Sequence, residues 1–534
     1  MILYVGLPPL MLVVAAFILV ILTLITRRKI IYDVYALLFS LSALILTILV
    51  FKLVYEGGKP AIYSFGGWPP PIGIFYEVDF LGAFLGVVVG VVMFLVVLYS
   101  IWYTGGLSGF EYYYALLLGM EAGMLGCIYT GDVFNLFVMF EVLAISCYGL
   151  VGFYRSKPAA VEAAIKYALI GALATTLYFL GLVFIYGSFG TLNMADLALK
   201  SRIGSIGYFP YSGFPISDVR VGGLVALALA LWAFTFKAAL FPSHFWLPDA
   251  HPEAPTPISA ALSGLVVKIG VYATVRFLYT IFSSNSLIAK GFLQLSPWSL
   301  LTYILLALGL LSGVLGALLM AIQIDVKRLL AYSTISHVGL IFMGIATGSG
   351  YGLAASTYHI MNHALGKALL FMSTGILVKM LNTRNLDELA GSGRFYPTVT
   401  IATILGILHM IGVPPFSGFY SKLLLYTSLF EMGGLLLASS IIIVSVISIF
   451  GYAKIIYSLM FKSPTSIVNK PPIEKNRSVS ILMLIIGLAT FILGLFADTI
   501  ITVVFKVAEN LSENGVAIYI QSALTAIQEL SPGG

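Results

Sequence analysis

Four ionisable side chains stand in the middle of long apolar stretches: Glu141, Lys237, Lys268 and Lys367. A charge at the centre of a membrane helix costs about 2.5–3.5 kcal/mol on insertion scales, so such residues are functional candidates by default. The alternative is that each is an isolated, paired structural group. Because these four lie too deep to reach the headgroups by extending along the helix, we interpret them as proton-transfer residues.

A second set of titratable groups follows helical spacing. His359, His363 and Lys367 recur at every fourth position, which places all three on one face of a helix. A polar stripe on an otherwise apolar helix should face the bundle interior or a water-filled cavity. Histidine titrates near neutral pH, so such a row suits proton relay. For His337, a hydrogen-bonded core histidine and a relay residue remain equal interpretations.

Metal and redox chemistry are not predicted. The spacing of His359 and His363 would suit a metal, but residues 360–362 lack the glutamate of a zinc protease helix, and no third ligand is evident. Cys127 and Cys147 stand apart within apolar spans and are interpreted as packed free thiols. Neither a cysteine cluster for iron–sulfur nor a dinucleotide glycine motif occurs. We therefore expect no metal and no cofactor.

Prolines accompany two of the lysines. Pro242 follows Lys237 closely, and Pro414 and Pro415 precede Lys422. A proline inside a membrane helix frees a carbonyl that side chains or water must satisfy. We therefore predict two broken helices, each with an open backbone beside a switchable charge, although a simple packing kink is the alternative.

The elements that position these residues are transmembrane helices. Charged residues make up 9% of 534 positions and apolar residues 60%, with a mean hydropathy of +1.04, whereas a soluble domain carries roughly 25% charged residues. The net charge of +6 is scattered over short loops, with no basic stripe interleaved with aromatics, so nucleic acid is not an expected partner.

The predicted fold class is an all-α polytopic membrane protein with about fourteen spans, each long enough to cross the ~30 Å hydrocarbon core. The expected spans are 8–26, 31–54, 78–102, 112–130, 133–153, 162–186, 222–245, 256–282, 298–322, 328–347, 353–380, 396–428, 433–460 and 479–505, followed by one tail helix over about 507–530. The first is expected to be a retained span, not a signal peptide. Lysine and arginine gather in alternate loops, which predicts a cell-membrane protein with both termini outside.

The chain also contains a weak internal repeat. Residues 162–169 resemble 363–370, and the two lysine–proline pairs fall in similar register. Five crossings per unit would make the second copy inverted, as in many transporters. The predicted organisation is N-terminal helices in 1–110, a first five-helix repeat in 111–285, an inverted second repeat in 286–461, and a last span with a tail helix in 462–534.

Several segments together resemble one known family. They are residues 131–141, 236–251, 254–260, 325–337 and 359–370. They are similar to the antiporter-like subunits of respiratory complex I, of Mrp-type sodium/proton antiporters, and of membrane-bound hydrogenases and their sulfur-reducing relatives. The D-type Mrp subunit and its hydrogenase counterparts are the most similar, and the resemblance extends over nearly the whole chain.

By this resemblance, Glu141 and Lys237 match the glutamate–lysine pair of the family, Lys268 its central lysine and Lys422 its terminal lysine. The resemblance implies a proton-translocating subunit that couples redox chemistry or a sodium gradient to proton movement. Its partners would be other membrane subunits and a peripheral redox module, since no redox centre of its own is expected and its status as an enzyme stays open. A stand-alone cation/proton transporter is the alternative, and a structural membrane scaffold is a third.

Overall fold

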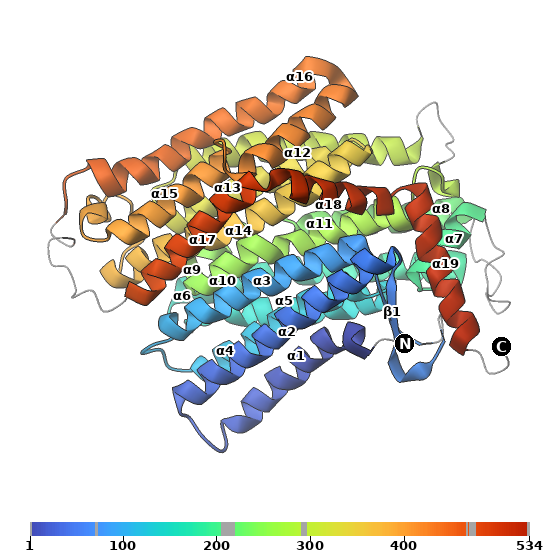
Figure 1. Cartoon of the computed structure of the whole chain (residues 1–534), viewed down its shortest axis with the longest axis horizontal. Helices are drawn as coiled ribbons and strands as arrows, with labels where there is room; N and C mark the ends of the chain where they lie inside the picture. The colour runs from blue at the N-terminus through green and yellow to red at the C-terminus, as the bar shows by residue number, and fades with distance from the viewer. Residues whose placement is uncertain are drawn as a thin grey trace.

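The computed structural model describes residues 3–69, 73–203, 219–289, 296–465, 468 and 477–530, and these form a bundle of long helices (Figure 1). In its first half the helices are α1 (Leu3–Leu22), α2 (Lys29–Gly57), α3 (Phe80–Tyr103), α4 (Phe110–Tyr129), α5 (Val133–Val151), α6 (Pro158–Phe189), α7 (Met194–Ile203), α8 (Val219–Lys237), α9 (Leu247–Glu253), α10 (Thr256–Ala261) and α11 (Val267–Val275). The second half has α12 (Pro297–Ile322), α13 (Val326–Ala346), α14 (Gly350–Leu381), α15 (Pro397–Ile411), α16 (Ser417–Ile456), α17 (Arg477–Leu495), α18 (Ala497–Asn510) and α19 (Glu513–Leu530).

Shorter elements complete the described chain. The 3-10 turns are η1 (Phe65–Gly67), η4 (Leu287–Ala289) and η5 (Ser392–Arg394), and the π turns are η2 (Leu262–Val266), η3 (Arg276–Ile281) and η6 (Tyr457–Phe461). One antiparallel hairpin, which the sequence did not predict, pairs β1 (Ala61–Ser64) with β2 (Phe75–Val78). Twelve helices in the described ranges are long and apolar enough to cross a membrane. The chain is therefore a predominantly helical, multi-pass membrane protein.

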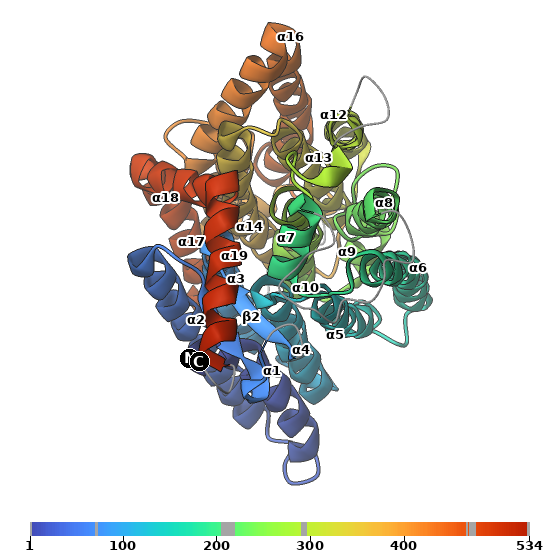
Figure 2. The same cartoon turned by 90° about the vertical axis from the view of Figure 1, so that its right-hand side faces the viewer.

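Three of the most buried spans carry Lys268, His337 and the polar stripe of α14. All of the most apolar stretch of Thr256–Ile281 is buried, as are 94% of that in Val326–Ala346 and 78% of that in Gly350–Leu381. In Lys29–Gly57 and Ser417–Phe461 the buried share is 28%. The end-on view places α10 and α14 inside the bundle and α1, α6 and α16 at its margins (Figure 2). Outward-facing leucine, isoleucine and phenylalanine side chains suit contact with lipid.

Helix α16 is interrupted by a reversal of the chain near its middle. Gly433 and Gly434 have non-helical backbone angles, and the φ of Gly434 is 67°, a conformation that glycine adopts without steric cost. Two arms of α16 meet at this point (Figure 1). The reversal falls at the first two residues of the expected span 433–460, shortly after the expected span 396–428 ends.

The C-terminal region differs from the expectation. The expected span 479–505 is two helices, because α17 ends at Leu495 and α18 continues from Ala497 to Asn510. The single tail helix expected over 507–530 is likewise interrupted. The Ser512 hydroxyl accepts a hydrogen bond from the backbone N–H of Gly515 (3.4 Å), which lets α19 begin anew. The tail helix expected over about 507–530 thus corresponds to α19, which begins later, at Glu513.

Helices α12 and α13 pack through a seam of glycines. A Cβ added at Gly339 would collide with the backbone of Gly309 and Gly313. Small residues of this kind let two membrane helices approach closely enough for backbone contact. The seam therefore fixes α13, and with it His337, against α12.

We predict that Gly339→Ala destabilises the fold by about 1–3 kcal/mol, because the added methyl group overpacks backbone that cannot move aside. The measurement is the thermal unfolding midpoint of the purified protein in detergent. The matched control is Gly350→Ala, whose added Cβ would meet nothing within 4 Å. Equal midpoints for the two variants would contradict the glycine seam.

Candidate functional site

The segment between α8 and α9 places Lys237 at a helix end. Helix α8 ends at Lys237, and Pro242 lies in the non-helical stretch before α9. The backbone N–H of Phe241, freed there, donates a hydrogen bond to the Ser312 hydroxyl of α12 (2.7 Å). The backbone of this segment is thus satisfied by a neighbouring helix, as a low-dielectric surrounding requires.

A similar arrangement surrounds Lys422. Helix α15 ends at Ile411, and Pro414 and Pro415 lie in the stretch that leads into α16. The Lys422 ammonium donates to the Ile411 carbonyl oxygen (2.9 Å) and to the Ser445 hydroxyl (3.1 Å). The lysine itself therefore satisfies a carbonyl freed at the end of α15.

Glu141 and Lys237 are neighbours without a direct ion pair. Both side chains are half-buried, and one carboxylate oxygen of Glu141 is buried with no hydrogen-bond partner among the described residues. Glu141 is the charged group that acts most strongly on Lys237, whose ammonium lies 5.8 Å from the centroid of the Phe140 ring. Within the ranges that the structure describes, no ion pair of 4.0 Å or less joins the two. Their coupling is therefore electrostatic across a gap.

The amine at the centre of the bundle contacts the histidine stripe directly. The Lys268 nitrogen donates to the Ser263 carbonyl oxygen (2.5 Å) and lies 2.5 Å from Nδ1 of His363. Both side chains are almost fully buried. Close packing of η2 on α14 enables this contact, because a Cβ at Gly264 would already touch the backbone of Ala364.

Two further histidines extend the row toward α16. Nδ1 of His337 lies 3.0 Å from Nε2 of His359, and the two rings stack with centroids 5.2 Å apart. Nδ1 of His359 lies 3.0 Å from the hydroxyl of Ser421, the residue before Lys422. His363 packs against His337 at 5.3 Å between ring centroids. A packed row of buried side chains therefore leads from Lys268 toward Lys422, with hydrogen-bond distances at three steps and a ring contact between His363 and His337.

The Lys367 side chain lies to one side of this row. Although it shares a helical face with the two histidines of α14, its ammonium donates to the Leu330 carbonyl oxygen (3.0 Å) and to the Ser333 hydroxyl of α13. Its nitrogen also lies 6.0 Å from the centroid of the Tyr452 ring. The structure thus brings Lys268, the histidines and Lys422 together in one row and places Lys367 beside it.

Two buried bases near this row were not predicted. His251 on α9 is fully buried, and both of its ring nitrogens lack a hydrogen-bond partner in the described part of the chain. The Lys327 ammonium donates to the Ala254 carbonyl oxygen (2.7 Å) and is also buried. The sequence signal for His251 was its place at the end of the segment 236–251. Lys327 was hidden by its position beside Arg328, which is typical of a loop margin.

Metal binding finds no support in the described geometry. Across residues 3–69, 73–203, 219–289, 296–465, 468 and 477–530, no group of three or more His, Cys, Asp or Glu side chains is arranged to hold a metal ion. The two facing histidines instead use their nitrogens for one another and for serine. The arrangement suits transfer of protons between bases.

Comparison with known proteins agrees with this geometry. Residues 130–451 match the family model described as NADH:quinone oxidoreductase/Mrp antiporter, TM. The chain belongs to this family. The matched region contains every proton-transfer candidate and the three prolines named above. The resemblance inferred from the sequence is therefore confirmed.

Relatives of this family member cover most of its length. It is 31% identical over 464 residues to the N subunit of the NADH-quinone oxidoreductase of Desulforudis audaxviator, with 84% of this chain and 88% of that one covered. It is 30% identical over 471 residues to the D-type subunit of the Na⁺/H⁺ antiporter of Alkalihalophilus pseudofirmus, with 88% and 90% covered.

Solved structures share the fold. A chain of the membrane-bound sulfane sulfur reductase, an archaeal respiratory membrane complex, superposes with a TM-score of 0.86 at 30% identity, covering 97% of this chain and 99% of that one. A chain of the Mrp complex from Dietzia sp. DQ12-45-1b gives 0.83 at 23% identity, with 98% and 100% covered. These structures are multi-subunit membrane complexes, and this family member is similar to one chain of each.

We predict that the thiol introduced by His363→Cys reacts with small hydrophilic reagents, whereas the thiol introduced by Leu369→Cys does not. Both native side chains are fully buried on α14, so the pair differs in polar surroundings and not in depth. Labelling yield in intact membranes is the measurement. Equal labelling at the two positions would remove the argument for a hydrated stripe.

Proposed function

We propose that this chain moves protons across the cell membrane as one subunit of a larger complex, using its buried bases as a relay. The observation that carries this proposal is the row from Lys268 through His363, His337 and His359 to Ser421, the neighbour of Lys422. Three of its four steps are contacts of 2.5–3.0 Å, and the His363 and His337 rings pack with centroids 5.3 Å apart. Titratable groups at hydrogen-bond distance in a low-dielectric interior are costly unless they serve a function. Proton relay uses them without a cofactor.

Within this relay, Glu141 sets the charge state of Lys237, and Lys237 exchanges protons with the central amine. Helices α8 and α11 are in close contact between the two lysines, since a Cβ at Gly270 would meet the backbone of Lys237 and Ala238. A carboxylate nearby favours the charged amine, and its neutralisation favours proton release. Lys367 lies beside the row, with its nitrogen 6.0 Å from the ring centroid of Tyr452, whose hydroxyl is 3.5 Å from Nε2 of His337.

The driving reaction belongs to a partner. With two isolated cysteines and no nucleotide motif, the chain offers no redox centre of its own. The 30%-identical neighbour is a chain of a sulfane sulfur reductase, and a second relative is named as a component of an Na⁺/H⁺ antiporter. Redox chemistry or a sodium gradient, supplied by other subunits, therefore drives the proton. Purification that yields co-migrating subunits supports this role, whereas a single active polypeptide would favour the stand-alone transporter.

The inverted repeat forms part of the proposal. Asp132 forms an isolated β-bridge with Asn193 at the start of α5, and Asp325 forms one with Asn385 at the start of α13. The first bridge lies beside β2 and α7, and the second beside α9, at opposite ends of the bundle (Figure 1). Matching contacts at opposite ends support two inverted units in 111–285 and 286–461, flanked by 1–110 and 462–534.

The proposed topology has fourteen spans. To the twelve apolar helices it adds α4, and it divides α16 at Gly433 and Gly434. Helix α15 with the first arm of α16 then forms a broken twelfth span, and α8 with α9 a broken seventh. An even number of spans places both termini on one side, and both lie at the same end of the bundle (Figure 1). The loop charge bias assigns that end to the outside.

We predict that Glu141→Gln abolishes coupled proton movement while the complex still assembles. Glutamine keeps the shape of the side chain and loses the charge that tunes Lys237. The measurement is proton uptake into vesicles that contain the reconstituted complex. The control is Glu56→Gln, which removes an exposed carboxylate paired with Lys52. Parental uptake in Glu141→Gln would contradict the assignment.

We predict that Lys237→Arg also stops proton movement, although it keeps a positive charge at this position. Arginine hardly ever releases its proton in a protein, so the variant separates a relay role from a static electrostatic one. Proton uptake is compared with that of Lys52→Arg, a replacement on the exposed surface. If Lys237→Arg pumps like the parent, the relay must run elsewhere.

A further inference from the structure

A buried ion pair lies at the end of the bundle that carries both termini. The guanidinium of Arg276, at the start of η3, donates to both carboxylate oxygens of Asp79, with Nη1 2.6 Å from Oδ2. The two side chains are 1% and 2% exposed. Asp79 also accepts a hydrogen bond from the backbone N–H of Gly82 (2.9 Å) and so caps α3. Such bidentate, charge-assisted contacts make a rigid anchor.

Beside this pair lies a second buried carboxyl group. Glu77 in β2 is fully buried, and neither carboxylate oxygen forms a hydrogen bond within the described part of the chain. The hydroxyl of Tyr519 on α19 is also buried and unpaired there, and its ring lies 5.6 Å from the guanidinium carbon of Arg276. A buried carboxylate without partners is costly, whereas a carboxyl that binds a proton is not charged. The geometry thus favours the protonated form of Glu77.

A polar helix face connects this cluster to the central amine. Lys268, Tyr272 and Arg276 recur at every fourth residue, the same spacing as the stripe on α14. All three are buried, and Nε of Arg276 donates to the Tyr272 hydroxyl (2.9 Å). The face therefore runs from the relay to the Arg276–Asp79 pair.

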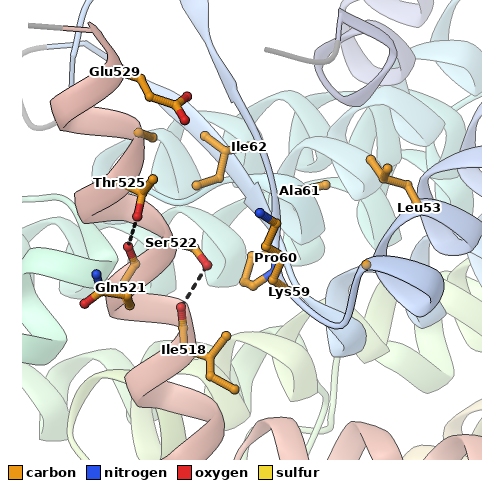
Figure 3. A pocket seen from close by; sticks show the side chains of 12 residues that line it. Leu53, Lys59, Pro60, Ala61, Ile62, Ile518, Gln521, Ser522, Thr525 and Glu529 are labelled. Carbon is orange, nitrogen blue, oxygen red and sulfur yellow. Dashed lines mark hydrogen bonds between the residues drawn. The ribbon is translucent and has the colours of Figure 1, made fainter. Parts of the chain in front are cut away.

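The hairpin and helix α19, which contribute Glu77 and Tyr519 to the cluster, also line a groove. A cavity of about 610 Å³ lies between β1 and α19 and is lined by Ile62, Ser522, Thr525 and Glu529 (Figure 3). Ile62 is the residue paired with Glu77 across the hairpin. Directly paired residues of two antiparallel strands point to the same face. The buried carboxyl therefore lies on the same face of the hairpin as Ile62, beside a residue that lines the groove.

We propose that Glu77 is a further proton-binding residue, through which protons pass between the Lys268 relay and this groove. The proposal rests on the proton-moving function argued above. Burial raises the pKa of Glu77 well above its usual range, and Asp79 raises it further, whereas Tyr519 and Arg276 oppose the rise. These are the titratable and charged groups that face Glu77 from α19, η3 and the start of α3. The Arg276–Asp79 pair holds them in place, and the carboxyl carries the proton.

The test compares Glu77→Gln with Glu529→Gln in the whole reconstituted complex. Glutamine mimics the protonated carboxyl, so the complex should assemble, and proton uptake should fall about a hundredfold, the scale that a positioned proton-transfer group contributes. Glu529 lines the same groove but is exposed, so its replacement should leave uptake unchanged. Failure of Glu77→Gln to assemble would overturn the proposal, because a proton-bound carboxyl tolerates an isosteric amide.

A second readout is independent of pumping. Infrared difference spectra should show the carbonyl stretch of a protonated carboxyl in the parent and in Glu529→Gln, and its loss in Glu77→Gln. Parental uptake in Glu77→Gln, with uptake abolished in Glu141→Gln, would overturn this inference alone. Parental uptake in both variants would instead overturn the proposed function.

Discussion

The rest of the structure depends on the cost of placing a charge in hydrocarbon. An ionisable side chain inside the bundle depends on protein neighbours for hydrogen bonds, because lipid supplies none, and without such partners it favours its neutral form. The helices that carry Lys268, His337 and the α14 stripe are accordingly surrounded by other helices, whereas the apolar helices form the margins. The arrangement of layers is thus a consequence of where the polar residues stand. A helix such as α2, which has few charged residues in its middle, can face lipid.

The two interrupted segments show how that cost is met locally. At each one the freed backbone bonds to a side chain, Ser312 in the first case and Lys422 in the second. The lysine therefore has two tasks, since it satisfies a carbonyl and is also a titratable group. Loss of its proton would turn a charge-assisted hydrogen bond to the Ile411 carbonyl into a weaker, neutral one. Charge movement and helix geometry are coupled at that point without any additional element.

Much of the fold and of the candidate site could be predicted from the sequence, because hydrophobic periodicity and polarity are local properties of the chain. Long apolar runs predicted the helices, and the separation of four residues between His359 and His363 predicted that the two share a helical face. The direction in which the Lys367 side chain points could not be predicted, because it depends on the positions of the Leu330 carbonyl and the Ser333 hydroxyl on α13, which accept its hydrogen bonds. The break between α18 and α19 could not be predicted either, because Ser512 lies in the middle of a polar stretch and gives no strong signal for the end of a helix.

The groups around Glu77 were missed for a different reason. Asp79 and Arg276 are far apart in the chain, and each has an ordinary local interpretation, as a helix cap and as a charge near a span end. Their pairing is visible only after α3 and η3 have packed together. Period-four spacing of Lys268, Tyr272 and Arg276 was the available signal. It was weaker than the α14 stripe because tyrosine is common in membrane helices.

The cluster around Glu77 contains residues from early and late parts of the chain, and the late part is helix α19. It lies across the end of the bundle and contributes Tyr519 to a cluster whose other members belong to β2, α3 and η3 (Figure 1). Helix α19 follows those members in the chain and is therefore synthesised after them. Until α19 has been made and has packed against the bundle, the guanidinium of Arg276 lacks its contact with the Tyr519 ring. The cluster is therefore assembled in two stages that follow the order of synthesis.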